Sequence, residues 1–213
     1  MSIKEIAEST ERLIKVVGAG RTGKTEALVA RCVQLLGQGV DPASVLVVTS
    51  TADGAAAFSE RVVAACTGAS GTDAATVAAG DALANAARAL RVRSAQDVCV
   101  SILASERAQA ATGRTPRELT AFERNFFLED LKTLGTPTRR LRGMIRHFEQ
   151  RMCDCVAADE VCDPGEEQTV YEHAQKLLGF MGAVLPEEVP FLCAHYLMSE
   201  AGAQDAQAYA YVL

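Results

Sequence analysis

Hydrophobic and polar residues follow one another along the first third of the chain in a pattern that predicts strands and helices in turn. Residues 12–17 are rich in apolar and β-branched side chains and run directly into glycines, which predicts a strand that enters a tight turn. Residues 25–36 carry a broad apolar helical face that ends at a pair of glycines. Residues 45–49 form a nearly continuous apolar run, as in a strand buried on both faces, and residues 55–65 predict another helix. This order predicts an α/β fold with a parallel sheet and right-handed crossovers.

Helical periodicity replaces these strand signals beyond about residue 105. The predicted helices span residues 119–131, 139–156, 166–181 and 186–198. Turns that contain glycine and proline separate them. We therefore expect three parts: residues 1–104 as the first part of the sheet domain, 105–185 as a helical insertion, and 186–213 as an incomplete return to the sheet domain.

The last residues also carry a pattern. Residues 208–213 predict a buried strand, whereas a chain terminus is more often polar and frayed. We therefore expect that the natural protein continues beyond Leu213.

Composition and charge narrow the class of protein. The 213 residues are 49% hydrophobic and 23% charged, which excludes a wholly disordered chain. No apolar run approaches the roughly 20 residues that a membrane-spanning helix needs, and residues 1–14 carry mixed charges rather than a secretory signal. We expect a cytoplasmic protein without a membrane partner. The net charge of −6 argues against a strongly basic nucleic-acid binder overall, although a local basic face remains open, and the seven cysteines are expected to be reduced.

A glycine loop lies between the first predicted strand and the first predicted helix. Residues 18–25 match the pattern G-x-x-x-x-G-K-[ST], in which backbone N–H groups and a helix N-terminus surround phosphate oxygens. We expect Lys24 to reach the β- and γ-phosphates, and Thr25 to place its hydroxyl on Mg²⁺. The predicted nucleotide site consists of Gly18, Ala19, Gly20, Arg21, Thr22, Gly23, Lys24 and Thr25.

The same three glycines also fit the dinucleotide-binding pattern G-x-G-x-x-G. That interpretation needs an acidic residue at the end of the second strand to bind the ribose, but the first acid after this strand is Asp53. The Lys24-Thr25 pair directly after the last glycine favours a phosphate loop. A glycine turn without any ligand is the structural alternative.

Several segments together resemble one family. Residues 16–25 are similar to the first motif of UvrD/Rep-type superfamily 1 DNA helicases, and residues 45–56 are similar to their motif Ia. Residues 58–62 resemble the helix that follows motif Ia, and Thr76 stands where the family has the sequence T-F-H-S. The resemblance implies a RecA-like P-loop NTPase domain with a parallel sheet and an all-helical inserted subdomain. It also implies ATP and Mg²⁺ as cofactors, and single-stranded or partly duplex DNA as the partner.

The sequence departs from the family in two motifs. There is no glutamine among residues 1–18, where the family's adenine-contacting motif belongs, so adenine selectivity is not supported. In motif Ia, Ser50 replaces the aromatic residue that stacks on a base, and such stacking contributes about 1–3 kcal/mol per base. We therefore expect these motif Ia residues to bind DNA weakly. The DNA contacts that the resemblance implies in these motifs are Thr49, Ser50, Thr51 and Thr76.

The resemblance also implies which steps of ATP binding and hydrolysis this chain can perform. The family's acidic Mg²⁺-binding pair would follow Leu213, and a second RecA-like domain supplies further arginines. Because stabilising the transferred phosphoryl group provides most of the catalysis, we expect this chain to bind ATP and hydrolyse it negligibly. The full protein would then be an ATP-dependent DNA helicase or translocase. Two alternatives stay open: a nucleotide-binding scaffold without unwinding activity, with recombination or repair proteins as partners, and another P-loop NTPase such as a kinase.

Two further clusters have both a functional and a structural interpretation. Arg139, Arg142 and Arg146 lie three and four residues apart, so they share one helix face that could contact DNA phosphates. The alternative is a solvated face paired with nearby acids. The sequence Cys153-x-Cys155-x₆-Cys162, with two histidines nearby, could hold a metal, but its irregular spacing favours ordinary thiols.

Overall fold

The computed structural model describes residues 2–68 and 74–213, with side-chain detail in the second range from residue 78 onward. The chain is helix-rich and contains a small parallel sheet, which is consistent with the predicted α/β fold. It divides into two compact units, Met1–Ala95 with Ala208–Leu213, and Gln96–Gln207. This division rests on spatial compactness, and the three-part domain organisation expected from the sequence stays a prediction.

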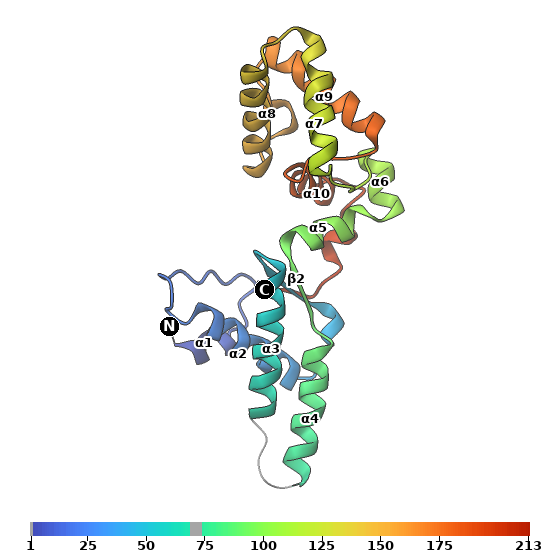
Figure 1. Cartoon of the computed structure of the whole chain (residues 1–213). Coiled ribbons are helices and arrows are strands. Elements are labelled where there is room, and N and C mark those ends of the chain that lie inside the picture. Colours follow the sequence, from blue (N-terminus) through green and yellow to red (C-terminus); the bar gives the residue numbers. More distant parts are fainter. Residues whose placement is uncertain (1, 69–73) are drawn as a thin grey trace. The chain divides into compact units, whose positions relative to one another are not determined.

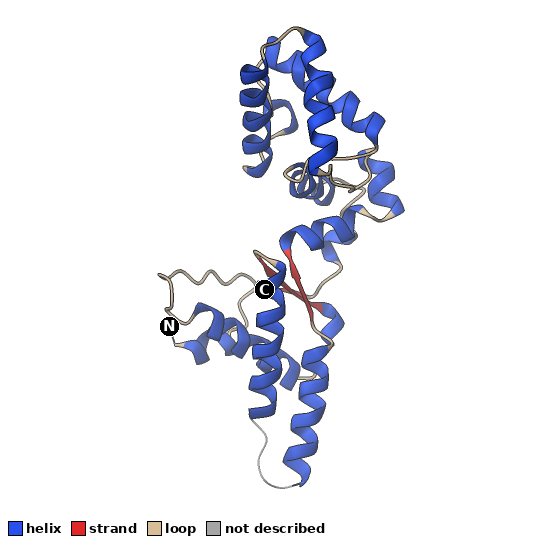
Figure 2. Ribbon diagram, viewed as in Figure 1, coloured by secondary structure: helices blue, strands red, loops and turns tan. Residues whose placement is uncertain are grey.

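The first unit holds the sheet (Figures 1 and 2). Its elements are α1 (Ile3–Glu8), α2 (Lys24–Gly37), a 3₁₀ turn (Pro42–Ser44), β1 (Val45–Thr49), α3 (Ala52–Gly68), α4 (Ala74–Arg88), β2 (Arg91–Ser94) and β3 (Tyr211–Val212). The strand order is β2-β1-β3 and both pairings are parallel, with Val47 opposite Val92 and Leu46 opposite Val212. The central strand β1 has the predicted bounds, and its side chains pack with those of α2, α3 and α4 in one core.

The strand predicted over residues 12–17 is wrong. Residues 9–23 form no regular structure, and the side chains of Leu13 and Val17 are 89% and 81% exposed. A strand is stabilised by a hydrogen-bonded neighbour, but residues 12–17 pair with none of the described strands β1, β2 and β3. The apolar pattern of residues 12–17 is therefore not sufficient to form a strand in this arrangement.

The buried strand predicted over residues 208–213 is also wrong in extent and in burial. Only Tyr211–Val212 form β3, and Val212 is 64% exposed. A strand with a neighbour on one side only leaves part of its surface to solvent. The sequence analysis did not predict β2, because Arg-Val-Arg-Ser has no apolar run.

The second unit consists of helices joined by short turns. Its elements are α5 (Ala95–Leu103), α6 (Glu106–Thr112), α7 (Ala121–Leu131), α8 (Thr138–Cys153), α9 (Glu166–Met181), α10 (Glu188–Met198) and three 3₁₀ turns (Lys132–Leu134, Ala158–Glu160, Asp205–Gln207). The four predicted helices of this part are confirmed, and α9 has the predicted bounds. Helices α7, α8 and α9 lie alongside one another and share a core (Figure 1). Among the residues that the structure describes, no helix is long and apolar enough to cross a membrane.

We predict that α9 depends on its buried face for stability. Leu178 is fully buried in the core of the second unit, whereas Phe180 on the same helix is 91% exposed. Leu178→Ala should lower the free energy of unfolding by about 2–5 kcal/mol, because it leaves a cavity. The matched change Phe180→Ala should cost less than about 0.5 kcal/mol. Urea unfolding followed by circular dichroism measures both, and equal effects would contradict the assigned faces.

Candidate functional site

The glycine loop leads directly into α2, as the sequence predicts, but the segment before it is irregular rather than a strand. Gly23 has φ +85° and immediately precedes the first helical residue, so the chain turns into the helix through a left-handed conformation that glycine adopts without strain. At Gly18 a Cβ atom would lie 2.5 Å from the Thr22 hydroxyl oxygen. Gly23 is therefore favoured by its backbone conformation, whereas a Cβ at Gly18 would require the Thr22 side chain to shift.

Hydrogen bonds within the loop converge on its own carbonyl groups. The Lys24 ammonium donates to the carbonyl oxygens of Gly18 and Ala19, at 2.6 and 2.5 Å. The Thr22 hydroxyl donates to the Ala19 carbonyl at 2.8 Å. The ammonium group is thus held over the loop instead of extending into solvent.

The first turn of α2 has N–H groups without a backbone acceptor. Gly23 provides no side-chain cap, and the Ala27 N–H donates to the Gly23 carbonyl at 2.9 Å. Of the three preceding helical residues, Glu26 donates its N–H to its own carboxylate, and those of Lys24 and Thr25 have no helical acceptor, so together with the helix dipole they favour an anion. Thr25 is exposed in this same turn.

A cavity of about 300 Å³ adjoins the loop. It is lined by Gly18 and Lys24, by the side chains of Ile3 and Ile6 from α1, and by Ala27, among others. The sequence analysis did not predict α1. A signal was present, because Ser2 and Glu5 form a capping box, a recognised mark of a helix start.

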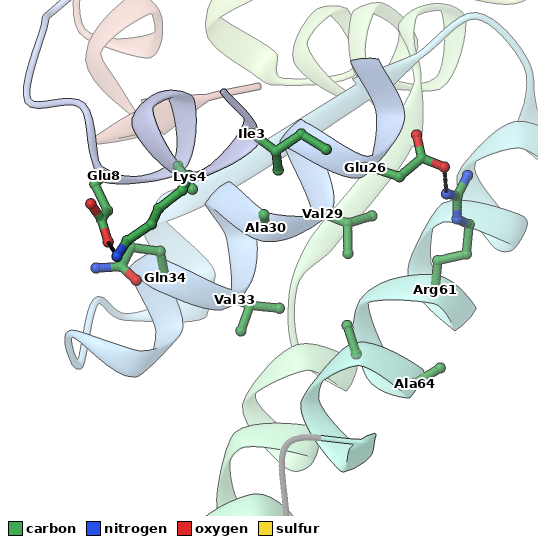
Figure 3. Close-up of a pocket in the computed structure, with 12 residues that line it drawn as sticks. Ile3, Lys4, Glu8, Glu26, Val29, Ala30, Val33, Gln34, Arg61 and Ala64 are labelled. Atoms are coloured by element: carbon green, nitrogen blue, oxygen red, sulfur yellow. Dashed lines mark hydrogen bonds and ion pairs between the residues drawn. The ribbon is translucent and has the colours of Figure 1, made fainter. Parts of the chain in front are cut away.

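The side of α2 that faces α1 and α3 carries a shallow apolar groove of about 780 Å³ (Figure 3). Ala30 and Val33 lie in its floor, and the carboxylate of Glu26 forms an ion pair at 2.7 Å with Arg61 of α3 at its edge. The pKa of Glu26 is lowered, first by its backbone hydrogen bond and then by Arg61. This ion pair joins α2 to α3 immediately after the glycine loop.

The segment that resembles motif Ia, residues 45–56, spans β1, the following turn and the start of α3. The Thr49 hydroxyl donates to the Thr51 carbonyl at 2.8 Å, and the Thr51 hydroxyl accepts from the Gly54 N–H at 3.0 Å. Both hydroxyl groups therefore stabilise the turn, and the exposed Ser50 lies between them. The backbone of Thr76 belongs to α4, but its side chain lies outside the described residues.

The structure places the three predicted arginines on one exposed face of α8. Arg139, Arg142 and Arg146 are all exposed, and within the described part of the chain none of them forms an ion pair. Their neighbour Arg140, in contrast, pairs with Glu166 at 2.7 Å. The sequence left open that this face is paired with nearby acids. Arg140 forms such an ion pair, and Arg146 interacts electrostatically with Glu149 without a close contact.

A small cavity of about 210 Å³ between α7 and α8 borders this face. Arg142, Arg146 and Glu149 contribute to its lining. Glu149 forms an ion pair with Arg124 of α7, and burial raises its pKa although Arg124 acts in the opposite direction. The carboxylate of Glu149 is thus engaged with α7.

The structure does not support a metal site on the cysteines. Cys153 and Cys155 are exposed and Cys162 is half-buried, and no described metal-ligand cluster includes any of them. In the residues searched, the donor atoms that lie close together belong instead to one histidine and two acids of the second unit. The spacing of the cysteines along the chain did not indicate this group, because its members come from three separate segments.

The fold and the loop define the class of protein: a helix-rich α/β chain in which a G-x-x-x-x-G-K-T loop opens a helix. The model of the UvrD/REP helicase N-terminal domain matches residues 2–179, which is most of the chain. The chain therefore belongs to this family, and the resemblance seen in the sequence is confirmed. No curated protein matches it.

Proposed function

We propose that residues 18–25 bind the triphosphate of ATP together with Mg²⁺, in a RecA-like domain with a helical insertion that belongs to a DNA helicase or translocase. The observation that carries the proposal is the position of the Lys24 ammonium, held at the loop carbonyls beside the uncapped start of α2. One positive charge beside a helix start without a side-chain cap matches the chemistry of a phosphate group.

The residues present fit this ligand. Lys24 can exchange its two carbonyl acceptors for phosphate oxygens, which are charged and accept stronger hydrogen bonds. The absence of a Cβ at Gly18 lets Thr22 approach and keeps the loop compact. Mg²⁺ would supply neutralisation of phosphate charge, and the exposed hydroxyl of Thr25 would hold it. The apolar side chains of Ile3 and Ile6 offer a surface for the nucleoside.

DNA, single-stranded or partly duplex, is the proposed partner. The family supports DNA as the substrate class. The exposed arginines of α8 support contacts to its phosphates, since within the described part of the chain none of the three forms a close ion pair. Thr49, Ser50 and Thr51 offer no aromatic surface for base stacking, so phosphate contacts would dominate the affinity.

A nucleotide-binding scaffold without unwinding activity is the second candidate. It is favoured by motif Ia, where the hydroxyls of Thr49 and Thr51 are already used within the turn. A motor couples nucleotide binding to its affinity for DNA. A scaffold would bind nucleotide without any change in that affinity.

The nucleotide site is tested by Lys24→Ala. Removing the ammonium should weaken binding of a fluorescent ATP analogue with Mg²⁺ at least tenfold, because the phosphate loses its charged donor. The matched control is Lys15→Ala, which removes an exposed lysine outside the loop and should change the affinity less than twofold. An unchanged affinity in Lys24→Ala would remove the central claim.

The α8 face is tested through the salt dependence of DNA binding. The triple change Arg139→Gln, Arg142→Gln, Arg146→Gln should reduce the slope of log affinity against log salt by about 2, at roughly 0.7 per single-strand phosphate contact. Arg140→Gln serves as a control, because Arg140 is engaged by Glu166 and should leave the slope almost unchanged. Fluorescence anisotropy with a labelled oligonucleotide gives both slopes, and equal slopes for triple variant and wild type would contradict the assignment.

A further inference from the structure

Three potential metal ligands converge in the second unit from three separate segments. His147 lies in α8, Asp163 in the turn before α9, and Glu167 in the first turn of α9. One donor atom from each lies within 4.8 Å of the other two. His147 Nδ1 is 3.1 Å from Glu167 Oε2.

Neighbouring contacts hold these ligands in place. The backbone N–H of Asp163 donates to Glu167 Oε2 at 3.3 Å, which fixes the turn against α9. Two residues earlier, Val161 is fully buried in the core. The Arg151 guanidinium also binds the Glu160 carbonyl, with Nε at 2.8 Å, and so ties the turn to α8. These contacts set the backbone position of all three residues, while the exposed Asp163 carboxylate is free to rotate.

The donor set narrows the choice of metal. Magnesium and calcium favour sites made of oxygen alone, whereas an imidazole beside carboxylates suits transition metals such as zinc, which accepts both nitrogen and oxygen ligands. Zinc bonds of about 2.0–2.1 Å in a tetrahedral site place ligand atoms about 3.3 Å apart. The His147–Glu167 distance already matches this separation. Asp163 is exposed, so its carboxylate can move inward by rotation of its side chain, and solvent can supply the fourth ligand.

We propose that His147, Asp163 and Glu167 form a zinc site that joins α8, the turn and α9. The site is separate from the glycine loop, which belongs to the first unit. Zinc would replace the direct His147–Glu167 contact with two stronger bonds. It would also connect the irregular segment after α8 to the helices on either side of it.

The test is a titration of the chelator-treated, reduced full chain with zinc chloride against a chromophoric chelator. Wild type should bind one zinc ion at this site, and its midpoint of thermal unfolding should rise, because the ion binds the folded arrangement. Glu167→Gln and Asp163→Asn should each weaken zinc binding at least tenfold. Asp163 is exposed, so its variant keeps the test valid even if a change at Glu167 disturbs folding.

Two controls separate this site from other zinc ligands. His173→Gln, a histidine of α9 outside the cluster, should keep wild-type affinity within twofold. The double change Cys153→Ser, Cys155→Ser removes exposed thiols that bind zinc readily, and it should also keep the affinity. The proposal is overturned if wild type takes up no zinc, or if uptake is lost in the cysteine variant and retained in Asp163→Asn and Glu167→Gln.

Discussion

Burial of β1 is the constraint on which the first unit depends. Val45 and Val47 are almost completely buried, and the strand is paired along both edges. The buried face of α2, with Cys32 and Leu35, packs into the same core. Because this packing fixes the axis of α2, it also fixes where α2 begins, and hence the position of the glycine loop. The Glu26–Arg61 ion pair adds a link to α3 one turn into the helix.

The loop itself is organised by its own polar groups. The Lys24 ammonium is held by two carbonyl oxygens of the loop, and the start of α2 beside it has no side-chain cap. The positive charge of Lys24 therefore lies beside the start of α2. The segment before the loop is irregular and belongs to no strand. The part of the loop next to α2 is held by the core, and the part before it is held mainly through Thr22 and Lys24.

Helix α8 organises the second unit through its two faces. Leu141, Ile145 and Phe148 belong to the buried stripe, and the exposed arginines occupy positions between them. His147 lies at the border of the two faces and is half-buried, which allows it to reach α9. Helix α8 thus has a buried face in the core and an exposed basic face. It also carries His147, which lies close to Asp163 and Glu167.

The sequence by itself determined the elements that depend on local pattern. The apolar run of β1, the helices α7 to α9 and the glycine loop could all be predicted, because periodicity and turn residues act over a few positions. The family followed from the same motifs. The exposed face of three arginines also followed from their spacing.

Only the tertiary structure decided the features that require a distant partner. Residues 12–17 have the pattern of a strand but no paired edge, and β2 has little pattern but pairs along β1. The contribution of α1 to the cavity beside the loop depends on its packing against α2. The convergence of His147 with Asp163 and Glu167 depends on how α8 packs with α9. The local sequence pattern shows which conformation a segment favours. Hydrogen-bonded neighbours and packing between separate segments decide whether that conformation forms and which residues it contacts.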